Sequence, residues 1–404
     1  MAADALAAGP LTGLRAIEFG QLLAGPFVGT LLGDFGADVI KIEAPGEGDA
    51  MRDWGRLRHN DHSLWWSILA RNKRSVTLNL RDPEGQRIAQ QLASSADVIL
   101  ENFRPGTMEK WGLGPEQVHA VNPGCVYARV SGYGQSGSYR DRAGFAAGGE
   151  AIAGLRYING YPGQAPPRCG ISLGDTLAAQ SAFQGILMAL YARDARGATG
   201  QVVDAAIADA CFAMTEAMVV EYDKVGFVRE PTGPFLPKIA PSNVYRSSDG
   251  KWVVIAANHD TLWKRLAALM GHPEWGEDER FADHTARGEH QALLDDLIGE
   301  WALQHTAAEL DEVVNAAGVV CAPVYTAEDI HADPWFRERG LVVSYEDEVH
   351  GTIAANGVVP KLMGTPGGVR HGARWTVGAD NEHVLGELGL SAEEIAELRE
   401  AGIT

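Results

Sequence analysis

The chain has 404 residues, of which 46% are hydrophobic and 22% are charged, as in ordinary globular proteins. Its formal net charge of −19 excludes nucleic acid and anionic membrane surfaces as expected partners. No apolar run reaches the roughly 18 residues of a membrane helix, and the N-terminus lacks the pattern of a signal peptide. Because the four cysteines form no C-x-x-C pair, we expect a cytoplasmic protein with reduced thiols.

The first part of the chain alternates short apolar runs with helical patterns. Each run has an apolar centre, which is typical of strands buried in a parallel sheet. The predicted strands cover 14–19, 37–43, 75–80, 97–102, 125–130 and 201–204, and the main predicted helices lie at 27–32, 83–93, 177–192 and 207–222. This order predicts an α/β fold with a parallel sheet covered by helices on both faces.

The pattern changes after a proline-rich stretch at 226–242, which we interpret as a linker. A hairpin, three helices and a short strand then precede a last helix. We expect them at 243–256, 262–270, 291–305, 306–318, 351–354 and from Ser391 onward. Thr306 with Glu309, and Ser391 with Glu394, have the spacing of capping boxes at two of these helix starts. A chain of this length is expected to form more than one domain. We therefore expect a large domain at 1–225, a smaller α+β domain at 226–335 and a C-terminal segment at 336–404 that returns to the large domain.

Asp175 stands where a loop rich in glycine and proline leads into the apolar helix pattern at 177–192. An aspartate in this place is usually a helix N-cap. The positive end of a helix also favours an ionised carboxylate, which can attack an activated acyl group. The glycine-rich approach would then offer backbone N–H groups to the developing oxyanion. The pattern alone leaves both roles open.

Ser172 lies in a G-x-S-x-G pattern that is typical of a hydrolase nucleophile. That mechanism needs a strand directly before the serine, whereas residues 166–169 read Pro-Pro-Arg-Cys. The serine hydrolase hypothesis is therefore the weaker one. His59 and His62 lack a third ligand in register, which favours loop histidines over a metal site.

Basic residues flank two of the predicted strands. Lys73 and Arg74 precede one strand, and Arg104 and Lys110 follow another. Loops at the carboxyl ends of parallel strands border the ligand crevice, so Arg104 and Lys110 fit an anionic ligand such as a nucleotide phosphate. Each of these residues alone also fits a solvated surface charge.

Motifs spread over nearly the whole chain resemble the family III coenzyme A transferases (CaiB/BaiF type), which include formyl-CoA and succinyl-CoA-dependent enzymes. The motifs are found at 11–19, 24–26, 32–43, 72–75, 101–106, 131–134 and 197–201. The resemblance implies that Asp175 is the catalytic nucleophile. It also implies a Rossmann-like large domain, a smaller α+β domain and two subunits interlocked as rings. Acyl-CoA would be a substrate, with no tightly bound cofactor and no metal.

The same resemblance implies a set of CoA-binding residues. They are Leu22, Leu23, Lys73, Arg74, Asn102, Phe103, Arg104 and Lys110. The chain departs from the family at Ala44, where some members have a basic residue for the adenine end. A second departure lies at 380–383, where Asp-Asn-Glu-His replaces the usual Gly-Glu-His stretch.

The α-methylacyl-CoA racemases are similar across the fold and form the main alternative. They place a catalytic histidine where Phe145 follows Arg142-Ala143-Gly144 here, so we favour CoA transfer. The run at 149–175 resembles relatives that move CoA from succinyl-CoA to small dicarboxylates or hydroxy acids. Arg156 and Arg168 would then pair with a distal carboxylate, although each also fits a surface role.

Overall fold

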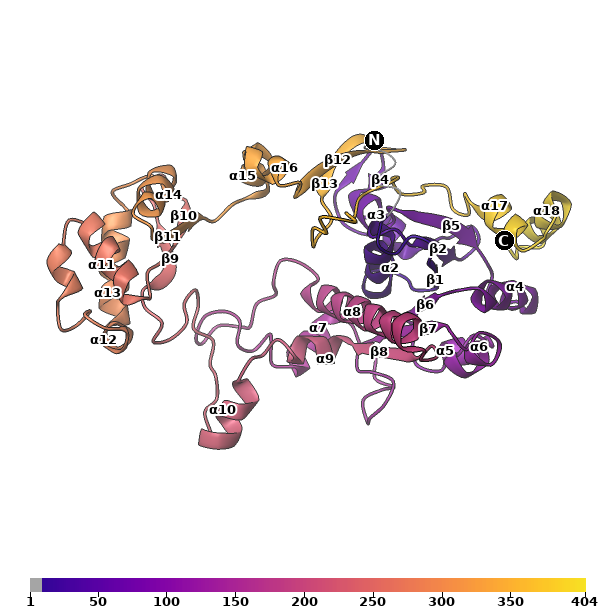
Figure 1. Ribbon diagram of the computed structural model, residues 1–404, viewed down its shortest axis with the longest axis horizontal. Coiled ribbons are helices and arrows are strands. Elements are labelled where there is room, and N and C mark those ends of the chain that lie inside the picture. The colour runs from indigo at the N-terminus through magenta and orange to yellow at the C-terminus, as the bar shows by residue number, and fades with distance from the viewer. Residues whose placement is uncertain (1–8) are drawn as a thin grey trace. The chain divides into compact units, whose positions relative to one another are not determined.

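The computed structural model describes residues 9–404 (Figure 1). Residues 1–8 lie outside the described residues. The expectation that the N-terminus lacks a signal peptide rests mostly on these residues. Contacts divide the chain into two compact units. The first unit comprises residues up to Leu155, Cys169–Ala217 and Pro334–Thr404, and the second comprises Arg156–Arg168 and Met218–Asp333.

A six-stranded sheet in the order β5-β2-β1-β6-β7-β8 forms the centre of the first unit. Every ladder in this sheet is parallel. The strands are β1 (Arg15–Glu18), β2 (Asp38–Glu43), β5 (Lys73–Thr77), β6 (Val98–Glu101), β7 (Val126–Ser131) and β8 (Val202–Ala206). In chain order the six strands occupy places 3-2-1-4-5-6, the order of a Rossmann fold. The predicted α/β class with a parallel sheet is confirmed.

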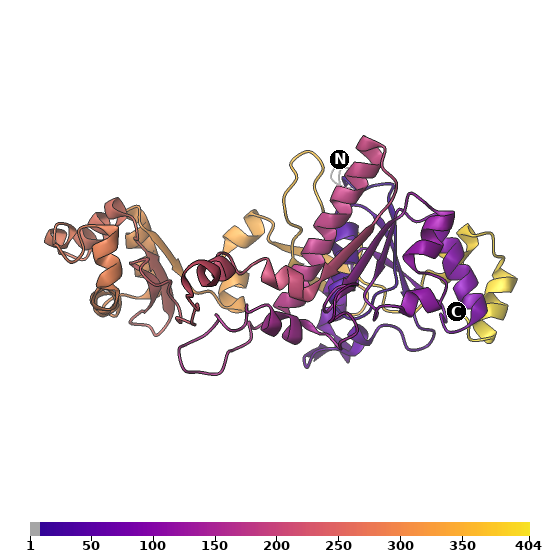
Figure 2. The ribbon, with the colours of Figure 1, turned by 90° about the horizontal axis from the view of Figure 1, so that it is seen from below.

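Helices cover both faces of this sheet because successive side chains of a strand point to opposite faces. On one face, Ala16, Val39 and Val126 belong to a core with α2, α8 and α9. On the other face, Ile17, Ile40 and Tyr127 belong to a core with α4, α6, α17 and α18. Figure 2 shows the long helix α8 on one side of the strands and the α4, α6 and C-terminal helices on the other. The sheet is therefore buried between two layers.

The helices of the first unit are short apart from α8. They are α2 (Ala24–Asp34), α3 (Leu64–Leu69), α4 (Pro83–Ser94), α5 (Thr107–Lys110), α6 (Pro115–Val121), α7 (Ala146–Ile152), α8 (Leu173–Arg196), α9 (Ile207–Phe212), α16 (Pro334–Glu338), α17 (Asn381–Glu387) and α18 (Ala392–Glu400), with a 3-10 turn η1 (Ala50–Asp53). Two antiparallel hairpins complete it: β3 (Arg58–His59) with β4 (His62–Ser63), and β12 (Val342–Asp347) with β13 (Gly351–Asn356).

The second unit is a small α+β body with its own core around Trp263 and Phe281. Its antiparallel sheet has the order β11-β10-β9, and β9 pairs with β10 across the predicted hairpin. The elements are α10 (Met218–Val225), β9 (Ser242–Arg246), β10 (Trp252–Ala256), α11 (Asp260–Leu269), η2 (Pro273–Gly276), α12 (His284–Glu289), α13 (Gln291–Ala302), α14 (Ala307–Ala316), β11 (Val320–Pro323) and α15 (Ala327–Ala332). The predicted capping box of Thr306 and Glu309 opens α14.

The predicted helix at 207–222 and the predicted strand at 75–80 differ from the structure. The single helix expected at 207–222 is divided into α9 and α10 because Glu216 has a φ of 52°, which no α-helix accommodates. This places α10 in the second unit, ahead of the boundary expected after residue 225. Strand β5 begins at Lys73 rather than Ser75, because Lys73 pairs with Val39 of β2. Within residues 9–404, the helices are all too short or too polar to span a membrane.

Candidate active site

A crevice opens at the carboxyl edge of the parallel sheet, where β1 and β6 lie side by side. In this strand order, the chain leaves β1 and β6 in opposite directions, which is the usual ligand site of such a fold. The side chain of Asn102, just after β6, ties the loop after β1 in place: its Oδ1 accepts from the Gln21 N–H at 2.8 Å, and its Nδ2 donates to the Gln21 carbonyl at 2.8 Å. Asn102 therefore shapes the crevice by positioning a loop.

A hollow of about 540 Å³ occupies this edge, lined by residues that follow β1, β2, β5 and β6. Phe103 and Trp111 meet there edge to face, with ring centroids 5.2 Å apart. Ala44 and Arg81 both line this hollow. Ala44 stands where a basic residue was expected for the adenine end. Arg81 thus brings a different basic side chain to the same hollow.

Arg104 and Lys110 are exposed on the segment that follows β6. Among residues 9–404, no carboxylate lies within ion-pair distance of either side chain. Two cations that neighbour Phe103 and Trp111 in the chain, beside a hollow with aromatic rings in its wall, offer a site for an anion with an attached ring system.

Lys73 occupies a different environment, because its side chain is only 2% exposed. Its Nζ lies 2.8 Å from Oε2 of Glu18 and donates to the Pro26 carbonyl at 2.6 Å. Lys41 holds the other oxygen of Glu18 at 2.9 Å. Burial lowers the pKa of Lys73, and Glu18 opposes this effect. The Lys73 ammonium is therefore bound by groups of the protein interior.

Arg74 points to the opposite face of β5 and is also held by carboxylates. Its guanidinium contacts Asp38 of β2 and lies 2.8 Å from Oε1 of Glu387 in α17. These contacts link the edge of the sheet to the C-terminal segment.

The turn between β1 and α2 positions the predicted contacts Leu22 and Leu23. Leu22 adopts a left-handed conformation with a φ of 64°, which is strained for a leucine. Its N–H donates to Oδ1 of Asp49 at 3.0 Å, and Asp49 in turn lies 2.7 Å from the Lys41 ammonium. The buried charges around β1 therefore stabilise this turn, and Leu23 follows it at the start of α2.

Asp175 lies in the first turn of α8 and is partly exposed. The N-cap position belongs to Ser172, so Asp175 is not the N-cap residue, and that part of the capping interpretation is wrong. The helix begins earlier than its apolar pattern because Leu173 and Gly174 already have helical geometry. The carboxylate still lies at the positive end of a long helix, where a negative charge is stabilised.

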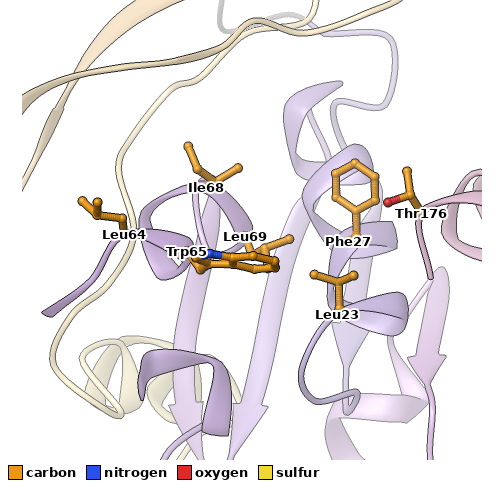
Figure 3. Close-up of a pocket in the computed structure, with 7 residues that line it drawn as sticks. All are labelled: Leu23, Phe27, Leu64, Trp65, Ile68, Leu69 and Thr176. Carbon is orange, nitrogen blue, oxygen red and sulfur yellow. The ribbon is translucent and has the colours of Figure 1, made fainter. Parts of the chain in front are cut away.

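An apolar cavity of about 290 Å³ lies beside this turn. Leu23, just before α2, and Phe27 of α2 face Trp65 and Leu69 of α3 across it, and Thr176 lies next to Phe27 (Figure 3). Because Thr176 directly follows Asp175 in α8, the cavity brings a predicted contact, Leu23, close to the predicted nucleophile. Its lining suits an uncharged, flexible chain rather than a phosphate.

Glu150 of α7 completes the surroundings of Asp175. Its side chain is buried, and its Oε1 accepts from the Gly174 N–H at 3.0 Å. Cys211 of α9 lies nearby: burial, then the charges of Glu150 and Asp175, raise the pKa of its thiol to about 11. Since Glu150 accepts the Gly174 N–H, that N–H is not available to a developing oxyanion.

The remaining predicted residues belong to other segments of the chain. Arg156 and Arg168 belong to the second unit, where Arg168 is exposed. No strand precedes Ser172 among the described residues 160–171, so the structural requirement of a hydrolase nucleophile is not met. His59 and His62 lie in the β3–β4 hairpin, and within residues 9–404 no group of three or more metal-binding side chains is found.

A Rossmann-type sheet with a crevice at the β1–β6 edge, and an aspartate in the first turn of the helix before β8, are features of an α/β enzyme whose ligand lies at the carboxyl ends of the strands. Residues 11–381 match the model of CoA-transferase family III, and the chain belongs to this family. It is a CoA-transferase.

Named relatives agree with this assignment. The chain is 50% identical to succinyl-CoA–D-citramalate CoA-transferase of Chloroflexus aurantiacus, over 96% of this chain and 97% of the relative. It is 40% identical to the beta subunit of succinyl-CoA–L-malate CoA-transferase of the same organism, again over 96% and 97% of the two chains. A solved structure of a CaiB/BaiF family protein from Brucella suis matches with a TM-score of 0.83 and 30% identity, covering 94% of this chain and all of that one.

Several residues at the site were not found from the sequence. Thr176 follows Asp175 directly and Trp111 follows Lys110, so proximity to a predicted site residue was the available signal. Arg81 and Glu150 reach the site only through the fold, because Glu150 contacts a residue 24 positions away.

Proposed function

We propose that the enzyme transfers CoA from succinyl-CoA to a small dicarboxylic or hydroxy acid, with Asp175 as the nucleophile. The observation that carries this proposal is the place of Asp175: a carboxylate at a helix N-terminus, beside an apolar cavity that also reaches the loop after β1. The substrates named for the 50% and 40% identical relatives support succinyl-CoA as donor and a hydroxydicarboxylate as acceptor.

In the first half-reaction the Asp175 carboxylate attacks the thioester carbonyl of the donor. A C–O bond forms, the C–S bond breaks, and CoA leaves as the thiolate, giving a mixed anhydride of Asp175 and the donor acid. The thiolate then attacks the Asp175 carbonyl and releases the donor acid as its carboxylate. The product is an Asp175–CoA thioester.

The second half-reaction reverses these steps with the acceptor. The acceptor carboxylate attacks the Asp175 thioester and again frees the CoA thiolate, which leaves an anhydride between Asp175 and the acceptor. Attack of the thiolate on the acceptor carbonyl forms the new acyl-CoA and restores the Asp175 carboxylate. At each step the negative charge passes between a carboxylate and the CoA thiolate. Atoms, charge and electrons therefore balance without a metal or a redox group.

Two regions of the first unit would hold CoA. The hollow with Phe103 and Trp111 offers aromatic rings to the adenine, and Arg81 offers a cation in the same hollow as Ala44. Arg104 and Lys110 are exposed and would pair with the phosphates. The apolar cavity beside Thr176 would receive the uncharged arm that carries the sulfur.

Arg156 and Arg168 are the proposed partners of the second carboxylate of the acid. An arginine fork recognises a carboxylate through two parallel hydrogen bonds. Replacing either residue by alanine should raise the KM for a dicarboxylic acceptor and leave the KM for a monocarboxylic acceptor unchanged.

A homodimer with interlocked subunits is part of the proposal. Helix α10 has no buried residue, and Tyr222 and Val225 are 64% and 76% exposed. On α8, Met188 and Tyr191 are 66% and 63% exposed. Exposed apolar residues of this size on two helices support burial by a second copy. Native mass spectrometry tests this, with a dimer as the expected species. The four free cysteines support a reducing, cytoplasmic setting.

The experiment that tests the function is an exchange assay. Purified enzyme is incubated with succinyl-CoA and a panel of acids, and the acyl-CoA products are followed by mass spectrometry. We expect CoA transfer to hydroxydicarboxylates, loss of transfer in Asp175→Ala, and normal transfer in Ser172→Ala. Release of free CoA without an acceptor in wild type, abolished in Ser172→Ala, would instead indicate a hydrolase.

A further inference from the structure

The start of α8 lacks the side-chain cap that its sequence offers. Ser172 stands at the N-cap position, but its hydroxyl accepts no hydrogen bond from the first turn. The first N–H groups of a helix have no partner within the helix and need one when they are buried. Gly174, the second residue of α8, is buried, so its N–H needs a partner from elsewhere.

Glu150 supplies that partner from another helix. Its carboxylate is only 4% exposed and accepts from the Gly174 N–H at 3.0 Å. We propose that Glu150 is a positioning residue that caps the first turn of α8 in place of Ser172 and thereby fixes the direction of the Asp175 carboxylate. This inference rests on the proposed role of Asp175 as the nucleophile.

The packing around Glu150 makes it a fixed support. Its neighbour Gly149 lies so close to α9 that a Cβ there would be 2.6 Å from Cγ2 of Ile207. A Cβ at Gly174 would be 3.0 Å from the same Ile207 carbon and 3.2 Å from Oε1 of Glu150. Helices α7, α8 and α9 therefore meet at close glycine contacts, and this packing holds the Glu150 carboxylate against Gly174.

The consequence for Asp175 follows from chain geometry. Asp175 is bonded directly to Gly174, so a shift of the Gly174 backbone redirects its carboxylate. A nucleophile displaced by about 1 Å loses on the order of a hundredfold in rate, whereas binding of a substrate held mainly elsewhere changes little. A positioning role therefore lowers kcat and leaves KM nearly unchanged.

Three substitutions separate the hydrogen bond from the charge. Glu150→Gln keeps an oxygen acceptor and removes the charge, Glu150→Asp keeps the charge and withdraws it by one methylene, and Glu150→Ala removes both. A matched control is Gln291→Ala in the second unit, because the Gln291 side chain is also buried and accepts a backbone N–H, that of Lys238, at 3.0 Å. Steady-state kinetics are measured together with the rate at which the Asp175 adduct forms after mixing with succinyl-CoA, followed by quenched mass spectrometry.

We expect kcat and the rate of adduct formation to fall about 10- to 100-fold in Glu150→Ala, with KM for succinyl-CoA within about twofold of wild type. Glu150→Gln should stay within about threefold of wild type, and Glu150→Asp should lie between the two. Gln291→Ala should lose thermal stability but keep its kcat. If Glu150→Ala does not fold, the Asp and Gln variants carry the comparison.

Wild-type kcat in Glu150→Ala or Glu150→Asp would overturn the proposal. Equal losses in Glu150→Gln and Glu150→Ala would also overturn it, because the charge and not the hydrogen bond would then be what matters. If wild-type enzyme forms no adduct at Asp175, the proposed function itself fails, and this result is distinct from an adduct that forms at the same rate in every variant.

Discussion

Two pairs of basic residues, Lys73–Arg74 and Arg104–Lys110, look alike in the sequence and differ in the structure. The first pair opens β5 and is held by the carboxylates of Glu18, Asp38 and Glu387. The second pair follows β6 and is exposed. A basic side chain that is already paired with a carboxylate of the protein is not available to an anionic ligand. Basic residues that belong to the same family motifs can therefore have different roles. Lys73 and Arg74 hold parts of the protein together, whereas Arg104 and Lys110 are open to a ligand.

The cysteines provide the largest expected contrast between buried and exposed groups. Burial raises the pKa of Cys125 to about 12, that of Cys211 to about 11 and that of Cys321 to about 12, whereas Cys169 is exposed. Because only the thiolate reacts, iodoacetamide at pH 8 should label Cys169 more than about 100-fold faster than the other three. Peptide mapping by mass spectrometry measures this. Labelling of Cys211 at the rate of Cys169 in native enzyme would contradict the buried position given to α9.

Lys73→Met should have the next largest effect, and it should act on stability. Removing the ammonium leaves one side of the buried Glu18 without its partner, which costs about 3 kcal/mol in the free energy of unfolding. Chemical denaturation measures the loss, and the double variant with Glu18→Gln should recover part of it. The KM for acyl-CoA of the folded variant should stay within about twofold of wild type. A KM raised tenfold without loss of stability would show that Lys73 contacts CoA and would break the comparison.

Arg104→Ala should act in the opposite way. The exposed guanidinium has no ion-pair partner among residues 9–404 to lose, so stability should change by less than about 0.5 kcal/mol. Loss of a charge-assisted contact to a phosphate should raise the KM for acyl-CoA by about tenfold with kcat unchanged. Steady-state kinetics at low and high salt measure this, and the difference between wild type and variant should shrink as salt increases. Arg104→Lys, which keeps the charge, is the matched control.

Arg74→Ala should give the smallest effect. Its ion pairs with Asp38 and Glu387 are partly exposed, so we expect a loss of about 1 kcal/mol in the free energy of unfolding and no change in KM. Thermal and chemical denaturation give the first value, and kinetics give the second. If Arg74→Ala raised the KM for acyl-CoA more than Arg104→Ala does, Arg74 rather than Arg104 would be the contact to CoA, and the comparison of the two pairs would be wrong.

Much of the fold could be predicted because local patterns determine it. Apolar centres identified the strands of the parallel sheet, and the Thr306–Glu309 and Ser391–Glu394 pairs identified two helix starts through capping boxes that the structure contains. The split of α9 from α10 was missed because a single left-handed residue, Glu216, interrupts an otherwise helical pattern.

The candidate site was predictable only in part. Asp175, Phe103 and Arg104 lie in motifs of the family, so the resemblance pointed to them. The burial of Lys73 depends on Glu18, which lies on β1, separated from β5 by β2, and the role inferred for Glu150 depends on packing among three helices. Contacts between residues far apart in the chain leave no local pattern, so these roles emerge only from the assembled structure.

Mapping the covalent intermediate tests the account most directly. Enzyme is mixed with succinyl-CoA, quenched with hydroxylamine or borohydride, digested and analysed by mass spectrometry. The account predicts that the modified peptide contains Asp175 and that the modification is absent in Asp175→Asn, which leaves the helix start nearly unchanged in shape. A modification at another residue, or full CoA transfer by Asp175→Asn, would contradict it.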